Sequence, residues 1–105
     1  MVAEETLAKV VKRLVSGFHP QQIILFGSQS RGTADSRSDI DILVVYPFKG
    51  DRGDIMLAMD KALKGLRMAR DIIVFTPEEF EIDRQIPGTI ARPAWREGRV
   101  LYEHS

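Results

Sequence analysis

The sequence has 105 residues, of which 44% are hydrophobic and 29% are charged. This balance is typical of one folded domain and excludes collagen-like, low-complexity and mainly disordered chains. Fifteen Lys and Arg residues match fifteen Asp and Glu residues, so no overall field attracts nucleic acid or an anionic membrane. Without cysteine, the chain has no disulfide framework and no Cys-ligated metal. We expect a single domain over 1–105 that does not bind nucleic acid directly.

The start of the chain does not resemble a targeting segment. Glu4 and Glu5 come before any apolar run, unlike the residues of a signal peptide. No stretch approaches the roughly 18 apolar residues that a membrane span requires. The cytoplasm is therefore the expected location.

The first half of the chain predicts one helix and two strands. Apolar residues recur at helical spacing over 4–16, and Gly17 begins the segment that is expected to end this helix. Continuous apolar runs over 23–26 and 40–46 are each followed by a turn residue. Short runs of this kind are typical of buried strands.

The second half predicts a crossover unit and two further helices. One helical stripe covers 54–66, and an apolar strand follows over 72–75. The next residues, Thr-Pro-Glu-Glu, have a capping hydroxyl, Pro at the first helical position and Glu at the third, which predicts a helix through about Arg84. A last helix is expected over 89–97, and 99–102 can add an edge strand.

Two carboxylates stand at the start of the second strand. Asp39 and Asp41 are two residues apart, so on an extended strand they share one face while Ile40 and Ile42 point into the core. Such a pair repels unless a cation or a shared proton offsets the charge. Mg²⁺ is the natural partner, because it takes one or two carboxylates together with phosphate oxygens.

The expected topology brings more polar groups to the same end of the sheet. A right-handed crossover leaves the second and third strands parallel, so Asp71, at the start of the third, lies near Asp39. If the first and second strands are antiparallel neighbours, Gly27 and Ser28 lie there too. Gly27 lets backbone approach a phosphate, the Ser28 hydroxyl can donate to it, and Arg31 can neutralise its charge. These groups predict a nucleoside triphosphate site with its metals.

Three motifs along the chain have a family resemblance. They are Gly27-Ser28-Gln29-Ser30-Arg31-Gly32, Ser38-Asp39-Ile40-Asp41 and the single Asp71. The chain resembles the nucleotidyltransferase superfamily that includes DNA polymerase β, and most closely its minimal nucleotidyltransferases, through about Tyr102. One difference is Ser30, where many relatives carry Ala. The resemblance implies an α/β (α+β) polymerase β-like nucleotidyltransferase fold, with a small mixed sheet and helices mainly on one face.

The resemblance also implies the role of each site residue. Asp39 and Asp41 bind two Mg²⁺ ions, and Asp71 joins the catalytic metal and helps to deprotonate an acceptor hydroxyl. Ser28 and Arg31 hold the triphosphate of ATP or another NTP. The implied reaction transfers a nucleoside monophosphate, AMP when ATP is the donor, and releases pyrophosphate.

The resemblance further suggests a protein partner. Small chains of this kind are similar to antitoxins that pair with a helical HEPN protein, an RNase toxin, and a Tyr hydroxyl of that toxin is the implied acceptor. Larger relatives add acceptor-binding domains where this chain ends, so another protein is expected to present the acceptor. A binding module that neutralises its partner by contact alone is the second hypothesis. Transfer to a small molecule such as an aminoglycoside is the third, and a homo-oligomer stays open.

Several of these residues also have a purely structural interpretation. Asp71 can be a strand-start carboxylate paired with Arg70. Ser28 can cap a helix, which does not exclude phosphate binding. Trp95 and Tyr102 are interpreted as core residues without chemistry.

Overall fold

The computed structural model describes residues 3–26, 40–66 and 68–104. Among these residues no helix is long and apolar enough to cross a membrane. All eight predicted elements are present in the predicted order. In sequence they are α1 (Glu4–Phe18), β1 (Gln22–Phe26), β2 (Ile40–Val45), α2 (Arg52–Ala62), β3 (Arg70–Phe75), α3 (Pro77–Asp83), α4 (Ala91–Glu97) and β4 (Arg99–Glu103).

Helix α2 begins and ends earlier than predicted. It starts at Arg52 because the Asp51 carboxylate caps it, accepting a hydrogen bond of 3.1 Å from the backbone N–H of Asp54. The helix stops at Ala62, four residues before the predicted end. Gly65, in the turn that follows, has a φ of 93°, a left-handed conformation that favours glycine and does not continue a helix.

The ends of α1 and α4 also differ from the prediction. Helix α4 begins at Ala91, because Thr89 belongs to the preceding turn: its hydroxyl donates hydrogen bonds to the carbonyl oxygens of Asp83 (2.6 Å) and Ile86 (2.9 Å). Helix α1 runs two residues beyond its predicted end. His19, with a φ of 55°, then forms its left-handed C-terminal cap.

The four strands form one mixed sheet in the order β3-β2-β1-β4. Strand β1 is antiparallel to both β2 and β4, whereas β2 and β3 are parallel and joined through α2. The predicted crossover, the antiparallel first pair and the C-terminal edge strand are therefore confirmed.

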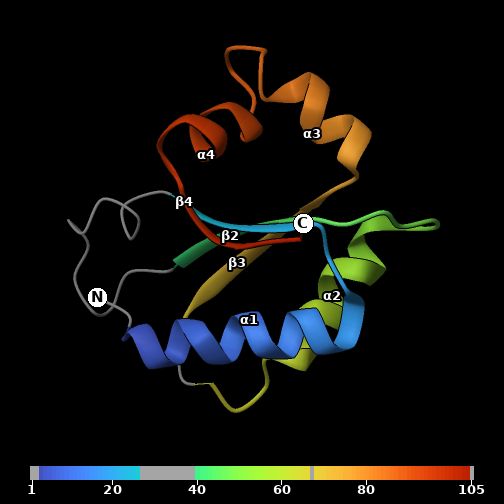
Figure 1. Cartoon of the computed structure of the whole chain (residues 1–105). Helices are drawn as coiled ribbons and strands as arrows, with labels where there is room; N and C mark the ends of the chain where they lie inside the picture. Colours follow the sequence, from blue (N-terminus) through green and yellow to red (C-terminus); the bar gives the residue numbers. More distant parts are fainter. Residues whose placement is uncertain (1–2, 27–39, 67, 105) are drawn as a thin grey trace.

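Helices cover both faces of this sheet. Helices α1 and α2 lie on one face, and α3 and α4 lie on the other (Figure 1). This arrangement confirms the small mixed sheet and differs from the expected packing mainly on one face. The reason is that the central strands are apolar on both sides: Ile23, Ile24 and Leu25 are consecutive and all buried. Strands buried on both faces need a cover on each.

The two faces have separate hydrophobic cores that share the central strands. Alternate side chains of β2 point into opposite cores. The core under α1 and α2 includes Leu14, Ile23, Ile40, Ile42, Val44 and Met59. The core under α3 and α4 includes Ile24, Leu43, Val45, Phe80, Ala91 and Ala94.

The interpretation of Trp95 as a core residue is wrong. Its side chain is 45% exposed on α4, and the guanidinium of Arg84 lies 4.9 Å from the centre of its ring. Tyr102 is half-buried and packs against the core under α1 and α2, in agreement with its interpretation.

Candidate active site

Asp41 and Asp71 lie beside each other on neighbouring strands. Each is the second residue of its strand, and the parallel register of β2 and β3 pairs their Cα atoms. The pair stands at the end of the sheet where β2 begins, on the left in Figure 1. The register therefore brings one carboxylate of the second strand and one of the third strand to the same end of the sheet.

Both carboxylates belong to the face that carries α3 and α4. Ile40 and Ile42, which flank Asp41, are fully buried in the core under α1 and α2, so strand alternation places Asp41 on the opposite face. Paired residues of adjacent strands point to the same side, which places Asp71 there as well. Asp41 is partly buried and Asp71 is exposed, so an incoming group can reach the Asp71 side of the pair.

Phe26 flanks Asp41 on the side away from Asp71. It is the last residue of β1, its Cα pairs with that of Asp41, and it packs against the core under α3 and α4. Phe26 lies outside the three sequence motifs. In the sequence, its position at the end of an apolar run, directly before Gly27, could have indicated that it lies next to the site.

Arg70 contributes indirectly by anchoring the start of β3. Its Nε donates to Asp60 Oδ1 at 2.9 Å, and its other guanidinium nitrogens donate to the carbonyl oxygens of Asp60, Leu66 and Met68. Arg70 therefore pairs with a carboxylate of α2 and not with Asp71. The structural interpretation of Asp71 as the ion-pair partner of Arg70 is not supported.

The remaining predicted site residues are Gly27, Ser28, Arg31 and Asp39. They lie outside the described residues. The described chain ends at Phe26 and resumes at Ile40, and the antiparallel register of β1 and β2 puts both of these residues at the Asp41 end of the sheet.

The described part of the site fits a hard divalent cation in its donor chemistry. Carboxylate oxygens are ligands that Mg²⁺ prefers, and two of them with substrate phosphate oxygens are a usual set. Asp41 and Asp71 supply two carboxylates from adjacent strands. Within the described ranges no group of three or more acidic, His or Cys side chains gathers around one point, and the third predicted carboxylate, Asp39, lies outside them.

Comparison with known proteins agrees with this geometry. The model of the family described as "Nucleotidyltransferase domain" matches residues 4–92. A protein of Methanocaldococcus jannaschii named "Putative protein adenylyltransferase MJ0604" is 35% identical over 104 residues, which cover 97% of this chain and 100% of that protein.

Solved structures with the same fold include two at 25% identity, each with a TM-score of 0.64 and covering 93% of this chain. One is a toxin–antitoxin structure with AMP-PNP, and the match covers 73% of its chain. The other is described as a putative nucleotidyltransferase from Sulfolobus solfataricus, and the match covers 78% of its chain. A Shewanella oneidensis complex of a tri-AMPylated HEPN toxin with an MNT antitoxin shares the fold at 22% identity and a TM-score of 0.59, with 96% of this chain and 72% of that chain covered. Since the family model spans most of the sequence and a relative matches along its whole length, the chain belongs to the nucleotidyltransferase domain family.

Proposed function

We propose that this chain transfers AMP from ATP to a Tyr hydroxyl of a HEPN-type toxin and thereby acts as its antitoxin. The observation that carries the proposal is the adjacent pair Asp41 and Asp71 at one sheet end of a nucleotidyltransferase-family domain. A relative along the whole chain is named as a protein adenylyltransferase, and a structural neighbour is a toxin–antitoxin with AMP-PNP. The same fold occurs in the complex with a tri-AMPylated HEPN toxin.

In the proposed reaction the acceptor hydroxyl oxygen attacks the α-phosphorus of ATP. A new phosphorus–oxygen bond forms, the bond from the α-phosphorus to the bridging oxygen breaks, and pyrophosphate leaves with the electron pair. The hydroxyl proton passes to Asp71, whose exposure lets an acceptor approach it. A carboxylate in this role typically contributes about 10²- to 10⁴-fold in rate.

The remaining roles follow the motifs around the described pair. Asp39 and Asp41 would hold two Mg²⁺ ions, with Asp71 as an additional ligand. When bound, Mg²⁺ neutralises triphosphate charge that the two carboxylates would otherwise repel. Ser28 and Arg31, with the backbone at Gly27, would bind the phosphates.

Co-expression with a HEPN-type partner protein, followed by intact-mass measurement, tests the proposal. We expect the partner to gain mass in whole AMP units, and to lose this gain when the co-expressed chain carries Asp39→Asn or Asp71→Asn. Asp54→Asn, the same change on the exposed first turn of α2, is the matched control and should leave labelling intact.

The outcomes separate the competing functions. A stable complex whose partner gains no mass would favour neutralisation by contact alone. Labelling of a small molecule or a nucleic acid, with no protein labelled, would contradict the protein acceptor.

A further inference from the structure

Most of the exposed large apolar side chains occur in one segment. Among the described residues six such side chains are exposed, and four of them lie on α3, α4 and the turn between these helices. We call them the α3–α4 patch: Ile82, Ile86, Ile90 and Trp95, each between 45% and 62% exposed. Gathered exposed apolar side chains usually mark a binding surface.

Local hydrogen bonds hold this patch in one arrangement. The Thr89 hydroxyl donates to two carbonyl oxygens of the turn, and Arg92 Nη1 donates to the carbonyl oxygen of Gln85 at 3.1 Å. Arg84 stacks on the ring of Trp95. A Trp beside an Arg, already fixed before binding, is typical of the residues that carry most of the energy of a protein interface.

The helices that carry the patch, α3 and α4, cover the sheet face on which the carboxylates of Asp41 and Asp71 stand (Figure 1). At the C-terminal end of α4, Gly98 approaches β1 so closely that a Cβ there would lie 3.0 Å from the carbonyl oxygen of Leu25. Leu25 directly precedes Phe26, whose Cα pairs with that of Asp41. Helix α4 therefore ends at the catalytic end of the sheet.

Positive charge next to the patch is confined to the α4 side, because α3 carries the acidic residues Glu78, Glu79, Glu81 and Asp83. A groove of about 460 Å³ runs along α4 and is lined by Arg92 and Arg96, with Pro87 and Pro93 as apolar walls and Glu97 as an acidic residue. A protein surface with an apolar centre and nearby carboxylates would complement both the patch and the groove.

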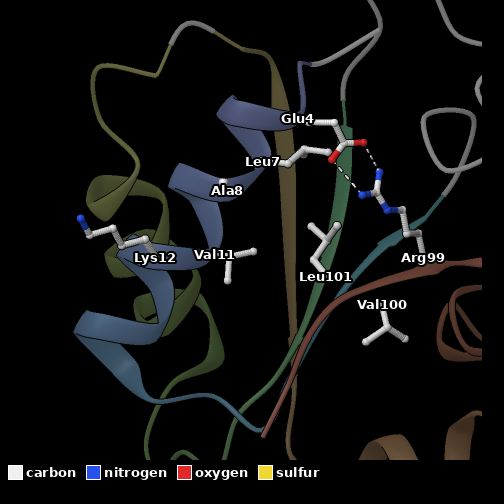
Figure 2. A pocket seen from close by; sticks show the side chains of 8 residues that line it. All are labelled: Glu4, Leu7, Ala8, Val11, Lys12, Arg99, Val100 and Leu101. Atoms are coloured by element: carbon white, nitrogen blue, oxygen red, sulfur yellow. Dashed lines mark hydrogen bonds and ion pairs between the residues drawn. The ribbon is translucent and has the colours of Figure 1, made fainter.

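Among the described residues, a second groove lies mainly on the other face of the sheet. This groove, of about 380 Å³, lies between α1 and β4, where Arg99 makes a two-pronged ion pair with Glu4 beside Val11 and Leu101 (Figure 2). Most of its lining comes from α1, on the face opposite the carboxylates. A protein bound against α1 would be separated from Asp41 and Asp71 by the sheet.

We propose that the protein that accepts AMP binds to the α3–α4 patch. The complementary surface of that protein would have apolar side chains flanked by carboxylates. This inference rests on the proposed function, because it takes the acceptor to be a protein. Docking there brings a hydroxyl to the Asp71 side of the pair without crossing the sheet, and it replaces water over the site with protein.

Ile90→Asp tests the patch with little risk to folding. Ile90 is the N-cap residue of α4 and makes no capping hydrogen bond, so an acidic residue there should favour the helix. The control is Leu57→Asp, an equivalent change from an apolar to an acidic side chain at a 54% exposed site on α2. Binding of the co-expressed acceptor protein and its AMP gain are measured for both variants, together with the Kd for ATP. Binding is also measured over a range of salt concentrations.

We expect Ile90→Asp to weaken acceptor binding at least about tenfold, which corresponds to about 1.4 kcal/mol, and to leave the Kd for ATP unchanged. Leu57→Asp should bind and label like the wild type, and salt should weaken wild-type binding. If the wild type labels the protein and Ile90→Asp binds and labels it equally well, this inference fails while the proposed function stands. If the wild type labels no protein at all, the proposed function fails, and the inference fails with it.

Discussion

Asp71 owes its position to its neighbour in sequence. Arg70 is pinned by four hydrogen bonds to α2 and the turn after it, which fixes the first residue of β3. The next side chain then points to the other face, beside Asp41. Arg70 therefore stabilises the start of β3, and the next residue, Asp71, is the candidate catalytic carboxylate.

Asp71→Asn should lower the single-turnover rate of AMP transfer by about 100-fold or more while changing the Kd for ATP little. The reason is that its proposed work is on the acceptor hydroxyl in the transition state. Because the side chain is exposed, the free energy of unfolding should change by no more than about 0.5 kcal/mol. Rapid-quench kinetics and ATP titration measure the two effects. An unchanged single-turnover rate would show that a residue other than Asp71 supplies the third carboxylate of the site.

Gly98→Ala should destabilise the fold by about 1–3 kcal/mol through overpacking. A Cβ at this position would lie 2.3 Å from the carbonyl oxygen of Ala94 and 2.6 Å from Ile24 Cγ2. The φ of Gly98 is −73°, so the cost is steric and not conformational. Gly17→Ala is the control: nothing lies within 4 Å of its Cβ position in α1, and the change should stabilise the chain by about 0.5–1 kcal/mol. Urea denaturation compares the two variants, and equal effects would contradict the close approach at Gly98.

At the scale of elements, the start of α3 is specified by its own sequence. Thr76 and Glu79 form a capping box, in which the Thr76 backbone N–H donates to Glu79 Oε1 at 2.9 Å and the Glu79 backbone N–H donates to Thr76 Oγ1 at 3.1 Å. Arg52, at the start of α2, also pairs with Glu79 and lies over the ring of Phe48. A local motif therefore also connects α3 to α2 across the edge of the sheet.

Glu79→Ala should lower the free energy of unfolding at pH 7 by about 1 kcal/mol. The Thr76 backbone N–H and then Arg52 hold the pKa of Glu79 below its ordinary value of 4.5. A lowered folded-state pKa means that the ionised carboxylate stabilises the fold above the unfolded value, and that this contribution is lost as the pH falls through the folded value. The advantage of the wild type should therefore be full at pH 7 and should shrink below about pH 4.5.

Glu78→Ala is the matched control for Glu79→Ala. Glu78 is exposed in the same first turn of α3 and lies outside the capping box. Thermal denaturation between pH 3 and pH 7 should show a smaller and less pH-dependent effect for this variant. Equal pH profiles for the two variants would contradict the role of Glu79 in the capping box.

For the whole molecule, the two cores share the central strands, so we expect them to unfold together. The radius of gyration is 12.9 Å, close to the roughly 13 Å expected for a folded chain of this length. Strands β1 and β2 place alternate side chains into both cores, for example Ile42 into one and Leu43 into the other. Loss of either core therefore exposes strands on which the other depends.

Unfolding in urea should accordingly be one cooperative transition. The single Trp95 reports on α4 alone, whereas far-ultraviolet circular dichroism reports on all the helices. We expect the same midpoint from both signals, and Phe80→Ala, which removes a buried ring from the core under α3 and α4, should lower both midpoints together. An earlier fluorescence transition would show that α3 and α4 unfold as a separate unit.

The sequence by itself determined the order and type of all eight elements, because periodicity, turn residues and the capping box act over a few residues. It also predicted that the second and third strands are parallel, since a crossover of this length has one preferred hand, and that Asp71 therefore lies at the sheet end of Asp39. The register that pairs Asp71 with Asp41 was decided by the tertiary structure. Element ends were less predictable where, as at Thr89, a side chain bonds to a turn six residues away.

Only the tertiary structure decided which faces the helices cover and where Arg70 binds. Continuous apolar runs such as 23–26 and 42–46 indicate strands that are covered on both faces, but they do not say which helices lie on which face. The partner of Arg70, Asp60, lies ten residues away on the crossover helix, and the packing of α2 against β3 selects it. Trp95 is exposed for the same reason: the apolar faces of α3 and α4 meet the sheet through Phe80, Ala91 and Ala94, which leaves its indole on the outer surface.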